Sequence, residues 1–339
     1  MKSTIKDVAR LAGVSVSTVS RVLSGSPRIS AETTARVKAI IQQIGYRPNL
    51  LARSLVERTS NIIAAVLPSS PKTMFSEPFF FDVLRGMGEY AAQEGYHLML
   101  STGCQGYKEE ESLRMLVDGG IVGGVVLLTS RVADTLMEEL LSMKFPFVVL
   151  GHPGREEDVC WVDNDNFSVG RAAAELLISR GCRRLVYWDY SPAHTVSVLR
   201  RQGFEAAIAA AGLEPQAQAV VEVSWGTCIP NEEEFQRLFS GERRPDGILA
   251  GDLMAMSLIS RLKEQGLRIP EDVSIVGFNN SPTGRICQPP LTSVDLSPAA
   301  LGRKTLELLL EQMANERQAP KHCHVPFELV ERQSVAGKP

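Results

Sequence analysis

The residues best suited to surface chemistry lie near the N-terminus, in the run Val16-Ser-Thr-Val-Ser-Arg21. At helical spacing, five of the side chains in this region fall on or near one open side: Val16, Ser17, Thr18, Ser20 and Arg21. Short side chains let a helix approach DNA closely, while hydroxyls and a guanidinium bond to bases and phosphates. The pattern is typical of a recognition helix, in which Val16 could touch a thymine methyl but could not hydrogen-bond a base.

Two short helices joined at a glycine would position this run. Thr4 and Asp7 form a capping box, Gly13 supplies the turn, and Ser15 can cap the second helix. Apolar residues at helical spacing give the pair a buried stripe: Ile5, Val8, Ala9, Ala12, Val19, Val22 and Leu23. A third helix is expected after Ser30, ending at Gly45. Any small amphipathic helical hairpin could show the same pattern, so charge has to decide between the two interpretations.

The charge of the chain is unevenly distributed. Residues 1–60 contain ten Lys or Arg and three acidic residues, a balance of +7, whereas the whole chain carries −3. A basic N-terminal segment on an acidic body concentrates a polyanion at that segment. The DNA-binding interpretation is therefore favoured for residues 1–46, which we expect to be a helix-turn-helix domain.

Bulk composition indicates an ordinary globular protein. A chain of 339 residues suggests two or three domains, and 44% hydrophobic and 22% charged residues are unremarkable for a protein in water. No apolar run approaches the length of a membrane span, and the helical hairpin stands where a signal peptide would be, so a cytoplasmic protein is expected. The six cysteines include no CxxC pair, which favours free thiols. His322-Cys323-His324 is the only local cluster of possible ligands, but alternation along a strand argues against a metal there, and no cofactor is expected.

Residues 47–60 are expected to form a hinge. Pro48 breaks the preceding element, Asn49 can cap, and the remaining residues make about two helical turns, which is marginal in water. The exposed leucines could simply pack on the core. Alternatively, Leu55 from each of two subunits could wedge into the minor groove and kink the duplex.

From Asn61 onward, buried strands alternate with helices in two series of similar length. Such a rhythm predicts an α/β core, residues 61–339, of two doubly wound parallel-sheet lobes with helices on both faces. The expected lobes are residues 61–161 plus 291–321, and residues 162–290 plus 322–339. Ligands in such folds bind beyond the carboxyl ends of the strands, so the crevice between the lobes is the expected pocket.

Motifs throughout the chain resemble the LacI/GalR family of bacterial transcription regulators. They include Thr4-Ile-Lys-Asp-Val-Ala, Thr18-Val-Ser-Arg-Val-Leu, Gly45-Tyr-Arg-Pro-Asn, Ala52-Arg-Ser-Leu55, Val162-Asp-Asn-Asp, Leu199-Arg-Arg-Gln-Gly-Phe, Gly251-Asp-Leu-Met-Ala, Ile269-Pro-Glu-Asp-Val-Ser-Ile-Val-Gly-Phe and Pro290-Leu-Thr-Ser-Val. The resemblance implies a helix-turn-helix head and a periplasmic-binding-protein-like core. It also implies a homodimer that binds a pseudo-palindromic operator in double-stranded DNA, and a small effector in the cleft that changes DNA affinity.

The resemblance also assigns site residues by position. The implied DNA contacts are Thr4, Ser15, Val16, Ser17, Thr18, Ser20, Arg21 and Arg28, with Asn49, Ala52, Arg53 and Leu55 in the hinge. The implied effector contacts are Phe79, Phe80, Asp163, His194, Arg200, Trp225, Asp252 and Asn279. Asn279 stands where the family usually has Asp, and Gly251 where it often has Asn, so the effector differs in detail. Of the triplet Phe79-Phe80-Phe81, we expect Phe81 to face the core.

Cleft chemistry favours a neutral saccharide as the effector. Arg200 is the main cation at the matched positions, whereas a phosphorylated ligand would favour several. We expect a repressor of carbohydrate-utilisation genes that a mono- or disaccharide releases from DNA, with an α-glucoside as the specific hypothesis. No leucine heptad follows the strand expected at Val325–Val330, so a dimer is expected rather than a tetramer.

Three other functions remain to be weighed. A transporter's solute-binding receptor could use the same core, but its export needs a signal peptide where the basic helices stand. An enzyme is disfavoured because the chain has no GxGxxG, P-loop or nucleophile-elbow motif. A co-repressor mechanism, in which the ligand tightens DNA binding, stays open because the direction of coupling depends on which state the effector prefers.

Overall fold

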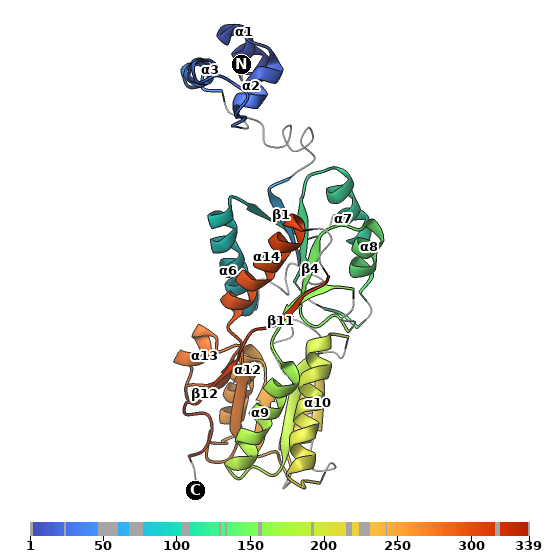
Figure 1. Cartoon of the computed structure of the whole chain (residues 1–339). Coiled ribbons are helices and arrows are strands. Elements are labelled where there is room, and N and C mark those ends of the chain that lie inside the picture. The colour runs from blue at the N-terminus through green and yellow to red at the C-terminus, as the bar shows by residue number, and fades with distance from the viewer. Residues whose placement is uncertain are drawn as a thin grey trace. The chain divides into compact units, whose positions relative to one another are not determined.

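The structure is a computed structural model. It describes residues 3–23, 25–46, 60–67, 77–102, 109–128, 130–132, 134–154, 158–190, 193–214, 219–223, 231–241, 243–315 and 319–337. The chain forms two compact units, Met1–Ser60 and Asn61–Pro339 (Figure 1). No helix in the described ranges is long and apolar enough to cross a membrane.

The first unit contains three helices: α1 (Ile5–Ala12), α2 (Val16–Leu23) and α3 (Ala31–Gln43). The predicted capping box is present, since the Thr4 hydroxyl accepts from the Asp7 backbone while the Asp7 carboxylate accepts from the Thr4 backbone. Gly13 ends α1 in the left-handed conformation, at φ 64°. The three helices share one small core: Val8, Ala9, Ala12, Val19, Val22 and Val37.

The second unit contains two six-stranded sheets. The sheet of the first lobe has the order β11-β5-β4-β3-β1-β2, and the sheet of the second has the order β12-β10-β9-β8-β6-β7. All pairings between the described strands are parallel except that of β10 with β12. The strands are β1 (Ile62–Val66), β2 (His97–Ser101), β3 (Gly124–Leu127), β4 (Phe147–Leu150), β5 (Cys160–Asp163), β6 (Leu185–Tyr190), β7 (Ala219–Val223), β8 (Gly247–Ala250), β9 (Ser274–Phe278), β10 (Thr292–Asp295), β11 (His322–His324) and β12 (Glu328–Val330).

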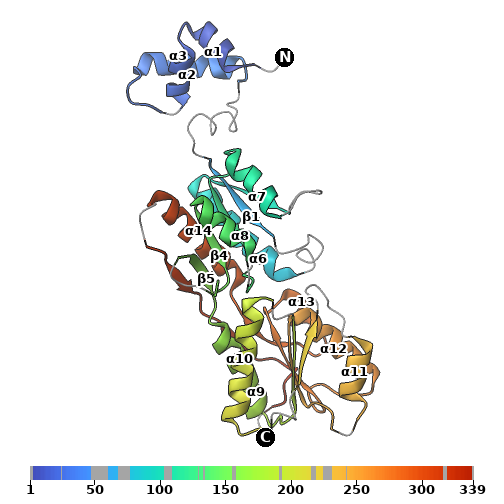
Figure 2. The same ribbon diagram turned by 90° about the vertical axis from the view of Figure 1, so that its right-hand side faces the viewer.

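Helices cover both faces of each sheet, as predicted. In the first lobe, α6 (Pro78–Glu94) and α14 (Pro298–Ala314) pack on one face and α7 (Glu109–Asp118) and α8 (Thr135–Met143) on the other (Figure 1). The second lobe repeats this arrangement, as Figure 2 shows. Its helices are α9 (Asn166–Ser179) and α10 (Thr195–Ala210) on one face, α11 (Glu232–Phe239) and α12 (Asp252–Glu264) on the other, and α13 (Pro282–Ile286).

Glycines let the paired helices touch backbone to backbone. A Cβ on Gly86 of α6 would overlap the Ala299 carbonyl of α14, and one on Gly302 would overlap the Val83 carbonyl. In the second lobe, a Cβ on Gly170 of α9 would overlap the Arg200 carbonyl of α10. Each lobe is therefore held together by a close helix crossing that leaves no room for a side chain.

The chain passes between the lobes three times, at residues 164–165, 296–297 and 325–327. This arrangement corrects the predicted lobe boundaries. Strand β10, expected in the first lobe, pairs with β9 of the second, and β11, expected in the second lobe, pairs with β5 of the first. The expected strand Val325–Val330 is reduced to β12, because residues 325–327 form the third crossing. Such short strands carry too little pattern to show which sheet they join.

The phenylalanine triplet and the histidine cluster also have definite places. Phe80 is 3% exposed and belongs to the core, whereas Phe81 is 50% exposed. The prediction that Phe81 faces the core is therefore wrong, because α6 directs Phe80 toward the sheet instead.

His322 stacks on Trp161, with ring centroids 5.0 Å apart, and His324 meets the same indole edge-on. Within the described residues, no group of three or more His, Cys, Asp or Glu could hold a metal ion.

Candidate DNA-reading helix and interlobe cleft

Helix α2 presents the predicted polar face. Val19 and Val22 are buried, while Val16 is 42% exposed and Ser17, Ser20 and Arg21 are exposed. Thr18 is half-buried. The exposed side of this helix therefore offers the methyl groups of Val16 beside hydroxyls and a guanidinium, as base and phosphate contacts require.

Ser15 orders the start of this helix. Its hydroxyl accepts a hydrogen bond from the Thr18 backbone at 3.1 Å. It also forms hydrogen bonds with the Ser17 and Thr18 hydroxyls, at 2.8 and 2.9 Å. Thr4 is exposed, but its hydroxyl donates to the Asp7 carboxylate at 2.7 Å and holds the pKa of Asp7 below its usual range. Arg28 is exposed in the loop between α2 and α3. The predicted hinge contacts Asn49, Ala52, Arg53 and Leu55 lie outside the described residues.

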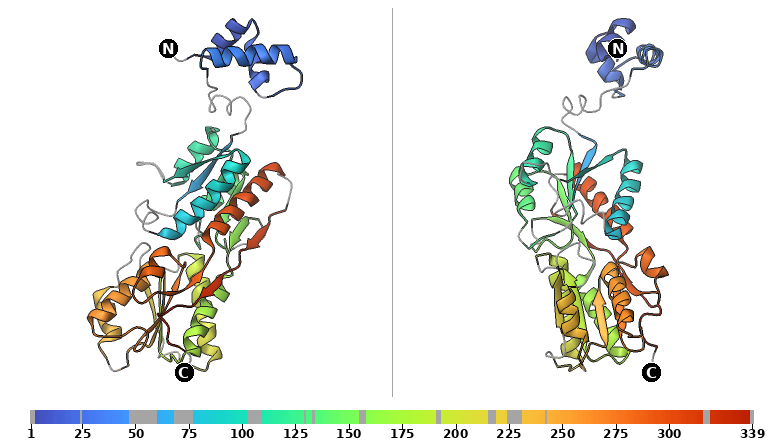
Figure 3. Two further views of the ribbon diagram at one scale, coloured as in Figure 1. Left: turned by 90° about the vertical axis from the view of Figure 1, so that its left-hand side faces the viewer. Right: turned by 180° about the vertical axis from the view of Figure 1, so that it is seen from behind.

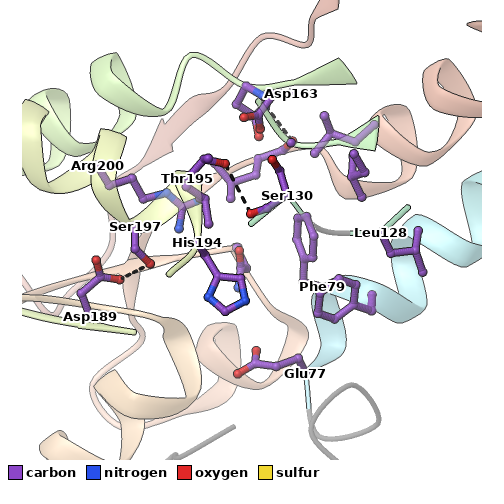
Figure 4. A pocket seen from close by; sticks show the side chains of 18 residues that line it. Glu77, Phe79, Leu128, Ser130, Asp163, Asp189, His194, Thr195, Ser197 and Arg200 are labelled. Carbon is purple, nitrogen blue, oxygen red and sulfur yellow. Dashed lines mark hydrogen bonds between the residues drawn. The ribbon is translucent and has the colours of Figure 1, made fainter. Parts of the chain in front are cut away.

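The second site is a cavity between the two lobes (Figure 4). Its walls come from the starts of α6, α10 and α14 and from residues at or just after the carboxyl ends of β3, β4, β5, β6, β9 and β10. This position is where parallel α/β sheets bind ligands. The lining residues are Glu77, Phe79, Phe80, Leu128, Ser130, Leu150, Gly151, Asp163, Asn164, Asp189, His194, Thr195, Val196, Ser197, Arg200, Asn279, Leu296 and Leu301.

Asp163 is a buried carboxylate at one end of this cavity. It accepts hydrogen bonds from the backbone of His152 (3.0 Å) and of Asn164 (2.8 Å) and from the Asn166 amide (2.8 Å). Burial raises the pKa of Asp163, and these bonds together with the nearby Arg200 charge oppose that shift. The carboxylate thus fixes the residues around it in place.

Arg200 reaches the same network from the second lobe. Its Nε donates to Asn166 Oδ1 at 2.8 Å, and its guanidinium carbon lies 4.9 Å from the centroid of the Phe278 ring. Asn166 therefore bridges Asp163 and Arg200. The helix crossing at Gly170, directly against the Arg200 backbone, sets where this side chain begins.

Aromatic and amide groups complete the cavity. Phe79 and Phe80 both line it, with their rings edge to face at 5.3 Å between centroids. His194 is buried in the wall at the N-terminus of α10. Asn279 follows β9 with a φ of 101°, and its backbone donates to the Val294 carbonyl at 2.9 Å.

Asp252 and Trp225 fall outside this constellation. Asp252 does not line the cavity: it is buried at the start of α12, where its carboxylate accepts from the Ser281 backbone (2.6 Å) and the Ser293 hydroxyl (2.7 Å). Burial raises its pKa, and its oxygens are occupied by the chain itself. The expected direct contact between Asp252 and an effector is not supported by this placement. Trp225 lies outside the described residues.

Several lining residues were not predicted. Glu77, Ser130, Asn164, Asp189, Thr195 and Ser197 all line the cavity. Asp189 could have been found, because it lies at the carboxyl end of a strand that the pattern predicts. Ser130 and Thr195 carry no such signal, since both are brought together only by the approach of the two lobes.

Family models match parts of both units of the chain. Residues 4–49 match the model of bacterial regulatory proteins of the lacI family, and residues 174–335 match a periplasmic binding protein-like domain. The transcriptional regulator CelR of Thermobifida fusca is 34% identical over 336 residues, and MalR of Staphylococcus xylosus is 30% identical over 335; each alignment covers 98% of both chains. The repressor PurR of Mannheimia succiniciproducens is 31% identical over 338 residues, again with 98% of both chains covered.

Solved structures of regulators are similar to this chain over nearly its whole length. A CelR–cellobiose complex is 32% identical, with a TM-score of 0.74 over 98% of this chain and 100% of that one. The lac repressor dimer bound to operator, at 22% identity, shares the fold, with a TM-score of 0.84 over 99% of this chain and 100% of that one.

A helix-turn-helix unit followed in one chain by a two-lobed core with a cleft defines a DNA-binding regulator of transcription. The chain belongs to the lacI family of bacterial regulatory proteins. It is accordingly a regulator and not an enzyme.

Proposed function

We propose that this regulator represses genes of carbohydrate use and that a neutral saccharide bound in the interlobe cleft releases it from its operator. The observation that carries the proposal is the charge of the cleft. Among the described lining residues, Glu77, Asp163 and Asp189 are carboxylic and Arg200 is the guanidinium. Two like charges 4 Å apart repel by about 4 kcal/mol at the effective dielectric of a protein surface, so a phosphorylated ligand is disfavoured.

The remaining lining groups suit a sugar. Phe79 offers a ring on which the C–H face of a pyranose can pack, and Arg200, Ser197 and Asn279 offer hydrogen-bonding groups for hydroxyls. The solved complex of CelR with cellobiose supports the same ligand class, because CelR aligns with nearly the whole of this chain. The similarity to PurR keeps a purine as the alternative to be tested.

Calorimetric titration of the full chain distinguishes these ligands. Cellobiose and maltose test β- and α-linked glucosides respectively, while glucose 6-phosphate and hypoxanthine test an anionic sugar and a purine. We expect heat of binding from a neutral sugar and none from the phosphate. Binding of hypoxanthine or glucose 6-phosphate alone would show that the assignment of ligand class is wrong.

The DNA side of the proposal places α2 in the major groove of a pseudo-palindromic operator, with Val16 and Ser17 at base edges. Fluorescence anisotropy with palindromic fragments from upstream of the adjacent genes measures this binding. We expect a palindromic fragment to bind more tightly than random duplex, and the saccharide identified by calorimetry to weaken that binding. Tightening by the saccharide would instead identify a co-repressor.

We further propose that the chain acts as a homodimer in the cytoplasm. Phe81 on α6 and Ile286 on α13 are 50% and 79% exposed, and Figures 1 and 3 show these two helices on the same side of the core. Large apolar side chains rimmed by polar ones are typical of a subunit interface. A second copy of this chain is the occupant that a two-fold operator requires.

A further inference from the structure

The two lobes are joined by a pair of backbone hydrogen bonds that the three crossings do not account for. The Val132 amide of the first lobe donates to the Ala193 carbonyl at 2.9 Å, and the Thr195 amide of the second donates to the Ser130 carbonyl at 3.3 Å. Between them, Arg131 and His194 pair as an antiparallel β-bridge. Figure 4 shows the contact between Ser130 and Thr195 inside the cleft.

This bridge forms part of the cavity wall. Ser130, His194 and Thr195 all line the cavity, and each is buried. Separation of the two lobes at Ser130 and Thr195 would therefore widen the cavity.

Both halves of the bridge are anchored within their own lobes. The Ser130 hydroxyl donates to the His152 carbonyl at 2.6 Å, which ties the residues after β3 to those after β4. Gly151 makes this approach possible, because a Cβ there would lie 3.1 Å from the Ser130 Cβ. On the other side, Thr195 is the first residue of α10, which is fixed by its crossing with α9. Opening of the lobes must therefore break the bridge rather than drag one half along.

We propose that residues 130–132 and 193–195 form a latch that holds the core closed and sets the rate at which the cleft opens. The latch is built from main-chain groups, so no ligand atom is needed to form it. Its effect on a ligand rests on the proposed function, but the latch itself requires no particular ligand. The two latch hydrogen bonds, Val132 to Ala193 and Thr195 to Ser130, would then govern how fast a ligand enters and leaves the cleft, although both lie far from the DNA-binding unit in sequence.

Thr195→Pro breaks the latch with little cost to the fold. Proline has no amide hydrogen, so the bond to the Ser130 carbonyl is lost, and the first position of a helix tolerates proline well. The preceding residue, His194, is already extended, with φ −107° and ψ 133°, as a residue before proline must be. Thr195→Val is the matched control: it keeps the amide and the β-branched shape and removes only the hydroxyl, whose contact with the Ser130 carbonyl is weak at 3.5 Å.

Hydrogen–deuterium exchange of the full chain without ligand provides the readout. Because one net hydrogen bond changes an opening equilibrium by about three- to tenfold, the Val132 amide should exchange about three to ten times faster in Thr195→Pro and at the wild-type rate in Thr195→Val. Equal Val132 exchange in all three proteins would overturn the latch. If α10 loses protection in the proline variant, Val132→Pro replaces it, because it removes the other main-chain donor of the latch, and unchanged exchange of the Thr195 amide there would equally overturn the proposal.

A second readout separates the latch from the identity of the ligand. With cellobiose as the probe, stopped-flow fluorescence should show faster association and faster dissociation in Thr195→Pro. Should cellobiose fail to bind while Val132 exchange still accelerates, the proposed saccharide is wrong and the latch stands. Cellobiose rates equal to those of the wild type, while Val132 exchange accelerates, would contradict control of the cleft by the latch.

Discussion

Replacing Asn164 by Ala should destabilise the core more than any exposed asparagine change. The Asn164 amide is buried and donates to the Leu296 carbonyl at 3.1 Å and to the Val325 carbonyl at 2.8 Å. These two carbonyls belong to the second and third crossings, and Asn164 itself belongs to the first. One side chain therefore ties all three connections between the lobes.

The expected cost follows from those two bonds. Removing the amide leaves two buried carbonyls without this donor, each at about 1–3 kcal/mol, for a total loss of about 2–6 kcal/mol in the free energy of unfolding. Asn61→Ala is the control, since the Asn61 amide makes a single bond of the same kind, to the Gly95 carbonyl at 3.1 Å, in an exposed setting. Water replaces such a bond, so this control should change stability by less than about 0.5 kcal/mol.

Urea unfolding of the full chain, followed by tryptophan fluorescence, measures both variants. Trp161 lies in the first lobe and Trp188 in the second, and both indoles are buried, so the signal reports on each lobe. A loss below about 1 kcal/mol in Asn164→Ala, equal to that in Asn61→Ala, would refute the reasoning. It would mean that water fills the space and bonds to both carbonyls.

Three further predictions concern the ligand, pH and assembly. Arg200→Gln should weaken binding of the saccharide found by calorimetry by about 10- to 150-fold, the contribution of one charge-assisted hydrogen bond. The control Arg201→Gln should leave this affinity unchanged, because the Arg201 guanidinium pairs with Glu205 and Glu222. Equal losses in both variants would show that Arg200 does not bind the saccharide. Hydrogen bonds from Arg268 lower the pKa of the half-buried Asp272 to about 2, so the stabilising effect of its charge is present above its unfolded value of 3.8 and is lost as pH falls through 2. Carboxyl NMR should show this midpoint, and Arg268→Gln should return it toward 3.8. Ile286→Asp should shift sedimentation from dimer toward monomer. The control Val132→Asp, at another exposed apolar residue, should leave the dimer intact. A dimer unaffected by Ile286→Asp would show that the interface does not include Ile286.

The sequence was most informative where its periodicity was long or its caps were explicit. The helices of the first unit and the alternation of strands and helices in the core follow from apolar spacing and from residues such as Thr4 and Gly13. Helix α14 was not predicted as an element, although it packs against α6 in the first lobe, because it follows the short and ambiguous strand β10. The sheet to which β10 and β11 belong depends on pairing across the fold, and no local pattern encodes it.

The residues of the cleft also fall into those that the sequence predicts and those that it does not. Phe79, Phe80, Asp163, His194, Arg200 and Asn279 were predicted by position and do line one cavity. Asp252 differs because its carboxylate is satisfied by Ser281 and Ser293, residues about thirty to forty positions away that the sequence does not place beside it. The contact between Ser130 and Thr195 is a property of two lobes meeting, and single-chain patterns do not contain it.

The close helix crossings at Gly86 and Gly170 have a mechanical consequence. Where main chain contacts main chain, no side-chain rotamer can change to absorb a displacement, so the two helices at each crossing are expected to move together. We therefore expect a molecule bound in the cavity to rotate one lobe relative to the other about the connecting peptides at 164–165, 296–297 and 325–327, rather than to deform a sheet. A one-carbon change, glycine to alanine, would push the paired helices apart at either crossing, and at Gly170 it would also displace the Arg200 backbone.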